Sequence, residues 1–211
     1  MTIQSAVIIG SGTMGRGIAQ VAATAGLTTS IYDVNAEQVK KALADIEKSL
    51  GKLVEKGKLP ADGAAKAKAN LKVCSSLDEI AWPKVGIAIE AIFENFEAKV
   101  ALYKQVEAKL PADAILASNT SSISITKLAA ATGRPSKFIG MHFFNPVPLM
   151  SLVEVIRGLQ TDDATVASVD ALAKQMGKNP LPCNDMPGFV SNRVLMPMIN
   201  EAAFALMEGV A

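Results

Sequence analysis

A glycine-rich turn directly after a short apolar run constrains the fold of this chain more than any other feature. The apolar residues Ala-Val-Ile-Ile at positions 6–9 are followed at once by Gly-Ser-Gly-Thr-Met-Gly. In this G-x-G-x-x-G pattern, Gly10 permits a tight turn, Gly12 lets a pyrophosphate approach the backbone, and Gly15 lets a helix lie close to the sheet. The turn therefore predicts a strand–helix unit that binds a dinucleotide at the helix N-terminus. The expected cofactor contacts of this turn are Gly10, Gly12, Thr13, Met14 and Gly15.

Asp33 indicates which dinucleotide is bound. It follows a second strand-like run at positions 28–32 and lies 23 positions after Gly10. An acid at this distance accepts hydrogen bonds from the 2′-hydroxyl of an adenosine ribose and repels a 2′-phosphate. The next residue, Val34, is not basic. The sequence therefore predicts NAD(H) rather than NADP(H). The alternative is a structural strand–helix–strand unit in which Asp33 only caps a loop.

Composition argues against several classes of partner. The 211 residues carry a net charge of +1, so no charge field favours nucleic acid or an anionic membrane. No uninterrupted apolar stretch reaches the roughly 18 residues that a membrane helix needs, and the start of the chain lacks a signal-peptide pattern. The isolated Cys74 and Cys183 indicate buried, reduced thiols in a cytoplasmic protein. With one histidine and no cysteine cluster, no metal site is expected.

Strand-like and helix-like segments alternate along the chain, which favours an α/β, Rossmann-type fold with a mostly parallel sheet and helices on both faces. A helical pair at about 36–70 interrupts this alternation as an arm. Asn35 is expected to cap its first helix, with Gln38 as the reciprocal capper. Thr161 is the expected N-cap of a later helix. Further strands are expected at 72–74, 85–91, 114–118, 137–141, 152–156 and 179–183, and helices at 96–108, 123–131 and 162–176.

The last segment differs from the rest. Pro187-Gly188 marks a boundary, and residues 189–207 are expected to form one long helix with apolar side chains on more than one face. Such a helix needs burial on several sides. We therefore expect residues 1–186 to form the NAD-binding domain and residues 187–211 to begin a helical domain that is truncated here. A partner that supplies the packing is the alternative.

Three polar segments are candidates for chemistry. Residues 118–122, Ser-Asn-Thr-Ser-Ser, follow a predicted strand, where open parallel sheets bind ligands. His142 follows another strand, and Glu154 lies 12 positions later. A carboxylate can hold a histidine in one tautomer and stabilise its protonated form. The third segment, residues 185–193, places a polar turn before the terminal helix. Each has an ordinary alternative: a helix cap, a core histidine, a structural ion pair or a surface turn.

Together these segments resemble the 3-hydroxyacyl-CoA dehydrogenase family, especially its bacterial short-chain members. The matching stretches are GSGTMG, ASNTSS, GMHFFNPVP, LVEV and DMPGFVSNR, in this order, and the resemblance covers residues 6–211. It implies a general base at His142 and an orienting carboxylate at Glu154. It also implies substrate contacts at Ser121 and Asn192. Further cofactor contacts are implied at Glu94, Lys99, Ser121 and Asn145, and coenzyme A contacts at Ser49 and Lys56.

The resemblance implies NAD-dependent oxidation of short-chain (S)-3-hydroxyacyl-CoA to 3-ketoacyl-CoA, and the reverse reduction. A usual member continues for about half a helical domain and forms a homodimer through it, whereas this chain stops inside the first such helix. Two other functions stay open. One is a non-catalytic, NAD-binding or structural member of the family. The other is a dehydrogenase of a free hydroxy acid.

Overall fold

One eight-stranded sheet organises the molecule. The computed structural model describes residues 2–211, and its strand order is β3-β2-β1-β4-β5-β6-β7-β8. Strands β1 to β6 are parallel, whereas β7 pairs antiparallel with β6, and β8 pairs parallel with β7. The predicted Rossmann-type, mostly parallel sheet is thus confirmed. The strands are β1 Ser5–Ile9, β2 Thr28–Tyr32, β3 Leu71–Cys74, β4 Ile87–Glu90, β5 Ile115–Ser118, β6 Phe138–Phe143, β7 Leu152–Arg157 and β8 Asn179–Asn184.

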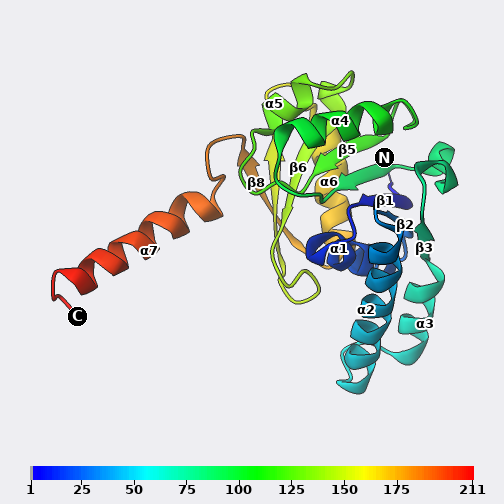
Figure 1. Cartoon of the computed structure of the whole chain (residues 1–211), viewed down its shortest axis with the longest axis horizontal. Helices are drawn as coiled ribbons and strands as arrows, with labels where there is room; N and C mark the ends of the chain where they lie inside the picture. Colours follow the sequence, from blue (N-terminus) through cyan, green and yellow to red (C-terminus); the bar gives the residue numbers. More distant parts are fainter. Residues whose placement is uncertain (1) are drawn as a thin grey trace.

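Helices cover both faces of the sheet (Figure 1). Alternate strand residues point to opposite faces. Ile8 of β1 packs in the cluster that includes α1, α2, α3 and α6, whereas Val7 packs in the cluster that includes α4 and α5. Fully burying one such side chain contributes roughly 1.5–3 kcal/mol, so both layers stabilise the sheet. The helices are α1 Thr13–Thr24, α2 Ala36–Glu55, α3 Ala61–Ala69, α4 Phe96–Glu107, α5 Ile125–Ala130, α6 Asp163–Gln175 and α7 Ser191–Met207.

Two predicted caps are corrected. Asn35 does cap α2, because its side chain accepts from the N–H groups of Glu37 and Gln38. Gln38 is not the reciprocal capper, however, since the Asn35 N–H donates to the Asp33 carboxylate at 3.1 Å. Asp162, and not Thr161, caps α6. The Thr161 hydroxyl is buried, donates to the Phe138 carbonyl at 2.7 Å and accepts from the Gly158 N–H at 3.0 Å, so it is not available to the helix.

Two helical segments project from the sheet in Figure 1: the arm of α2 and α3, and the terminal helix α7. Helix α7 begins two residues later than predicted and contains no buried residue. Its exposed apolar side chains include Val194, Leu195, Met196, Met198, Ile199, Phe204, Leu206 and Met207. The expected apolar surface is present, and within residues 2–211 nothing covers it. No helix in this range is long and apolar enough to cross a membrane.

Candidate active site

The glycine-rich turn joins β1 to α1 as predicted, and its three glycines meet different surroundings. A Cβ on Gly10 would lie 2.5 Å from the Ala91 carbonyl oxygen, and one on Gly15 would lie 1.7 Å from the Gly10 carbonyl oxygen. No larger residue fits at either position. A Cβ on Gly12 would meet only the Gln38 Nε2 atom, at 3.9 Å. Gly12 therefore faces open space at the start of α1, where the backbone N–H groups can receive a phosphate.

Asp33 stands in a cavity of about 450 Å³ beside this turn. One of its carboxylate oxygens accepts from the Ser11 N–H at 2.7 Å and from the Ser11 hydroxyl at 3.0 Å. The exposed side chains of Val34 and Phe93 form apolar walls, and Gly10 and Gly12 line the same space. An acid, apolar walls and a side-chain-free turn suit the adenosine half of a dinucleotide. The residues present therefore fit NAD.

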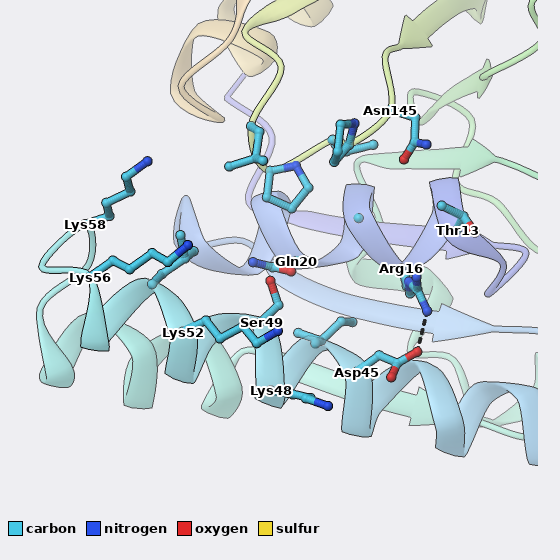
Figure 2. A pocket seen from close by; sticks show the side chains of 17 residues that line it. Thr13, Arg16, Gln20, Asp45, Lys48, Ser49, Lys52, Lys56, Lys58 and Asn145 are labelled. Atoms are coloured by element: carbon cyan, nitrogen blue, oxygen red, sulfur yellow. Dashed lines mark hydrogen bonds and ion pairs between the residues drawn. The ribbon is translucent and has the colours of Figure 1, made fainter.

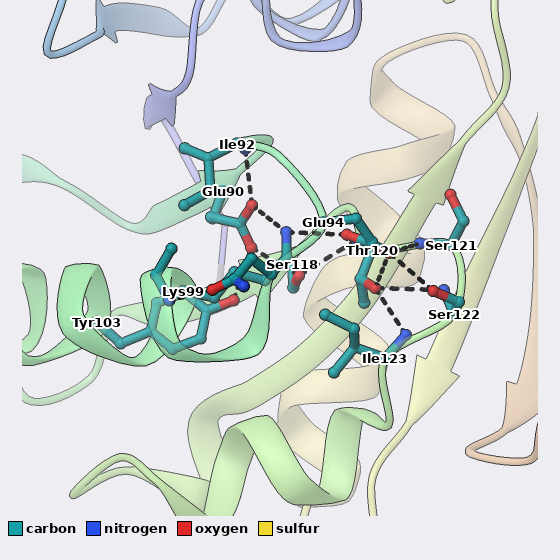
Figure 3. Close-up of polar contacts among 12 residues, drawn as sticks. Glu90, Ile92, Glu94, Lys99, Tyr103, Ser118, Thr120, Ser121, Ser122 and Ile123 are labelled. Atoms are coloured by element: carbon teal, nitrogen blue, oxygen red, sulfur yellow. Dashed lines mark hydrogen bonds and ion pairs between the residues drawn. The ribbon is translucent and has the colours of Figure 1, made fainter.

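A buried polar network lies beneath the loop that follows β5 (Figure 3). Glu90, the last residue of β4, is fully buried and accepts from Lys99 Nζ at 2.6 Å, from the Tyr103 hydroxyl at 2.6 Å and from the Ser118 hydroxyl at 2.8 Å. Burial, and then the charge of Glu90, raise the pKa of Tyr103 well above its usual value, so the phenol stays protonated. Our sequence analysis missed Glu90. The sequence feature that could have revealed Glu90 is an acid at the end of a buried strand, nine residues before Lys99 on the next helix.

Glu94 connects this network to the loop. Its carboxylate accepts from the Ser121 N–H at 2.8 Å, from the Ser122 hydroxyl at 3.2 Å and from the Thr120 hydroxyl. Lys99 Nζ lies 3.2 Å from Glu94, but the Lys99 side chain is 1% exposed, whereas that of Glu94 is 37% exposed. Burial opposes the ionisation of Glu94, but the bonds from Thr120, Lys99 and Ser121 outweigh it and lower its pKa. The predicted contact of Lys99 with the cofactor stays a prediction, and Glu94 is the more accessible of the two.

Our alternative that the serine and threonine cluster caps the following helix is wrong, because Ser124, which lies outside the cluster, caps α5. The Thr120 hydroxyl oxygen accepts from the Ile123 N–H at 2.9 Å, and Ser124 caps α5 through the Lys127 N–H. These bonds keep residues 123 and 124 outside the helix, which begins at Ile125 and not at 123 as predicted. Ser121 is not used in this way and stays exposed. The cluster therefore both shapes the loop and presents Ser121 to solvent.

His142 and Glu154 form a buried pair. The antiparallel pairing of β6 and β7 places the two residues directly opposite one another. His142 Nδ1 lies 2.7 Å from a carboxylate oxygen of Glu154, and the two side chains are 8% and 0% exposed. The rings of Phe144 and Phe189 flank the imidazole, with centroids at 4.6 and 6.0 Å. The structure thus brings together the predicted base and its predicted partner.

The second oxygen of Glu154 accepts three hydrogen bonds at the beginning of α7. The donors are the Val190 N–H at 3.0 Å, the Ser191 N–H at 2.8 Å and the Ser191 hydroxyl at 2.9 Å. Burial raises the pKa of Glu154, but the bonds from His142, Ser191 and Val190 outweigh this effect, and the pKa falls below its usual value. Glu154 is therefore ionised at neutral pH and faces His142 as an acceptor. The role of Ser191 was not predicted.

Asn192 and Ser121 are also brought together. The Asn192 side-chain amide donates to the Ser121 carbonyl oxygen at 3.3 Å, which joins the start of α7 to the loop after β5. Nearby, the Asn119 side chain accepts from the Phe143 N–H at 2.9 Å and fixes the end of β6. Because β5 and β6 are parallel neighbours, these groups lie at one edge of the sheet.

A second cavity, of about 440 Å³, lies between α1, α2 and residues 145–149 (Figure 2). The predicted residues Ser49, Lys56 and Asn145 all line it, together with Thr13 of the glycine-rich turn. Asn145 thus shares a cavity with Thr13 and not with Asp33. Arg16 of α1 pairs with Asp45 of α2 inside this space. The cavity also has a basic rim that sequence analysis missed, formed by Arg16, Lys48, Lys52 and Lys58.

Comparisons with known proteins identify the family of this chain. A family model described as "3-hydroxyacyl-CoA dehydrogenase, NAD binding domain" matches residues 5–186. A "Probable 3-hydroxybutyryl-CoA dehydrogenase" of Deinococcus radiodurans is 53% identical over 204 residues, covering 97% of this chain and 72% of the relative. A protein of the same description from Bacillus subtilis is 48% identical over 211 residues, covering 100% and 73%.

A solved structure gives the same result. The crystal structure of (S)-3-hydroxybutyryl-CoA dehydrogenase PaaH1 from Ralstonia eutropha superposes with a TM-score of 0.95 at 50% identity. The superposition covers 100% of this chain and 74% of that one. The cofactor is NAD. The family model describes an NAD-binding domain, and the glycine-rich turn and Asp33 line one cavity that suits it. The chain belongs to the 3-hydroxyacyl-CoA dehydrogenase family.

Proposed function

We propose that this chain catalyses the NAD-dependent oxidation of short-chain (S)-3-hydroxyacyl-CoA esters to 3-ketoacyl-CoA, and the reverse reduction. The observation that carries the proposal is the buried His142–Glu154 pair at the edge of a dinucleotide-binding sheet. The names of the relatives from Deinococcus radiodurans and Ralstonia eutropha support the acyl-CoA class and the short chain.

His142 is the general base of this proposal. An ionised carboxylate can only accept hydrogen bonds, so Glu154 holds the hydrogen on Nδ1 and leaves the Nε2 lone pair free. Nε2 takes the proton of the 3-hydroxyl group while a hydride leaves C3, and the carbon–oxygen single bond becomes a carbonyl. When bound, NAD⁺ supplies the acceptor for that hydride. Glu154 stabilises the imidazolium that forms, and in the reduction the same imidazolium returns the proton.

Ser121 and Asn192 hold the reacting oxygen in this proposal. Ser121 is exposed on the loop after β5, and Asn192 reaches that loop from α7. A hydroxyl and an amide can both donate to an oxygen on which negative charge develops. Glu94 supports this arrangement because its carboxylate accepts a hydrogen bond from the Ser121 N–H and so fixes the main chain there.

The cavity between α1, α2 and residues 145–149 is the proposed binding site for coenzyme A. Ser49 lies on its floor and Lys56 at its end, among the basic side chains labelled in Figure 2. Phosphate groups are favoured by several lysines and an arginine, although each exposed contact is modest and weakened by salt. This basic rim supports a coenzyme A ester over a free hydroxy acid.

We also propose that residues 1–186 form the NAD-binding domain and that residues 187–211 begin a helical domain through which the protein forms a homodimer. The exposed apolar surface of α7 supports this assembly, since such surfaces mark protein interfaces. Light scattering across a concentration series would measure the molar mass of the protein in solution and so test for a dimer.

The test is the loss of NADH absorbance on addition of acetoacetyl-CoA. The wild-type chain is expected to turn over, and His142→Ala is expected to lose about 10²–10⁴-fold in rate while it still binds NADH. Free acetoacetate and free coenzyme A serve as controls. Turnover of acetoacetate without inhibition by coenzyme A would replace the thioester by a free hydroxy acid. NADH binding without any turnover would favour a non-catalytic member of the family.

A further inference from the structure

A buried lysine outside the proposed catalytic machinery holds the loop between β6 and β7. Lys178 lies between α6 and β8 and is 6% exposed. Its Nζ donates to the carbonyl oxygens of Val147 and Met150, at 2.5 and 2.8 Å. Burial lowers the pKa of Lys178. A buried ammonium group that faces two main-chain carbonyls fixes the backbone which carries them, because hydrogen bonds from a charged donor are strong and costly to leave unmade.

The same loop forms one wall of the cavity assigned above to coenzyme A. Residues 145–149 line this cavity, opposite α1 and α2. The two carbonyls held by Lys178 flank Pro148 and Leu149 in the chain. Lys178 itself does not line the cavity. Lys178 therefore does not touch a ligand there, and its side chain contacts the cavity wall through the loop.

A second contact seats the loop on α1. A Cβ on Gly17 would lie 2.8 Å from the Val147 Cβ atom and 3.6 Å from the Pro148 Cδ atom. Val147 is 2% exposed, so its side chain cannot turn aside into solvent. Lys178 thus holds the loop from one side. On the other side the loop packs closely against α1, because Gly17 has no side chain.

We propose that Lys178 is a positioning residue for coenzyme A recognition. It fixes residues 147–150 against α1 so that Pro148 and Leu149 form the wall of the cavity opposite the basic rim. This inference rests on the proposed function, since it assigns coenzyme A to that cavity. It concerns the nucleotide part of the substrate and not the chemistry at C3.

The test compares three variants of the chain by calorimetric titration with coenzyme A and, separately, with NADH. Lys178→Met removes the ammonium group but keeps the length of the side chain. Gly17→Ala displaces the loop from the opposite side and leaves Lys178 intact. Lys174→Met is the matched control, because Lys174 lies on α6 with its side chain 65% exposed and pairs with Asp170.

The Lys178→Met and Gly17→Ala variants are expected to weaken coenzyme A binding about tenfold or more and NADH binding less than about twofold. The control is expected to change neither.

A kinetic comparison separates positioning from general damage. Acetoacetyl-CoA and the acetoacetyl thioester of N-acetylcysteamine share the reacting group, but only the first carries the nucleotide. Lys178→Met should lower kcat/KM for the first about tenfold more than for the second. An equal loss for both thioesters, or equal weakening of NADH and coenzyme A binding, would overturn the inference. If Lys178→Met does not fold, as judged by circular dichroism, Lys178→Gln, a shorter neutral side chain at the same position, decides by the same measurements. If the wild-type chain reduces the short thioester but does not bind coenzyme A, the proposed cavity assignment fails first.

Discussion

Ser191 makes two hydrogen bonds to a single carboxylate oxygen of Glu154, through its main-chain N–H and its hydroxyl. The other oxygen of that carboxylate faces His142. An anion at the beginning of a helix is favoured by the helix dipole, so Glu154 stabilises the start of α7 while it orients the imidazole. The helix that lies outside the sheet is thereby joined to the reacting centre by three hydrogen bonds to one carboxylate oxygen.

This relationship predicts a pH-dependent contribution to stability. The pKa of Glu154 is lowered in the folded chain, because the bonds from His142, Ser191 and Val190 outweigh the effect of burial. The stabilising contribution is therefore complete above the unfolded-state pKa of about 4.3 and is lost as pH falls through the lower folded-state value. Glu154→Gln should have a lower free energy of unfolding than wild type at neutral pH, and the difference should shrink in acid. Urea unfolding across a pH series measures it. A difference that stays constant with pH would contradict the prediction.

The buried carboxylate beneath the loop should matter for stability. Glu90→Gln removes the charge that neutralises Lys99 and leaves a buried ammonium with Glu94 alone. Breaking a buried ion pair from one side costs about 3 kcal/mol or more. The matched control is Asp78→Asn, which breaks the exposed pair with Lys109 and should cost about 1 kcal/mol or less. Denaturant unfolding of both variants measures the difference, and equal losses would show that the Glu90 network is not a stabilising element.

The acid after β2 should set cofactor preference. Asp33→Asn keeps the size of the side chain but removes the charge that repels a 2′-phosphate. We expect the ratio of kcat/KM for NADH over NADPH to fall about tenfold, which corresponds to about 1.4 kcal/mol of lost discrimination. The Ser11 N–H still finds an oxygen at this position, so the thermal midpoint should change little. An unchanged ratio would show that other contacts select the cofactor.

The two thiols should be inert in the folded chain. Burial, and then the charge of Glu154, raise the pKa of Cys183 to about 11, and burial raises the pKa of Cys74 as well. Only about one part in 10³ of Cys183 is then thiolate at about pH 8, and the thiolate is the reactive form. A thiol reagent should modify neither cysteine until denaturant is added. Rapid modification of the native chain would contradict this, and peptide mapping would identify the cysteine.

Local patterns in the sequence predict much of this structure, because each of them depends on near neighbours. The glycine-rich turn and the Asn35 cap are of this kind. Features that depend on distant partners were missed. Lys178 looks like an ordinary solvated lysine in a turn, and Thr161 looks like a cap until its hydroxyl meets Phe138.

The direction of β7 could have been predicted but was not. Only eight residues separate the end of β6 at Phe143 from the start of β7 at Leu152, and a parallel crossover needs about a dozen or more. The pairing of His142 with Glu154 across these strands could not have been predicted from their spacing, because it depends on the register. Register is set by the sheet as a whole.

Two kinds of sequence change have different effects on the hydrogen-bonded ladder between β6 and β7. A shift by one residue in β6 would turn His142 to the opposite face, and a shift in β7 would turn Glu154, so either shift would separate the pair. Insertions between residues 144 and 151 would leave the ladder in place. The same short connection lines the cavity beside α1. Substrate preference can therefore diverge by exchange of one loop, while the proton-transfer pair is inherited unaltered in the adjoining strands.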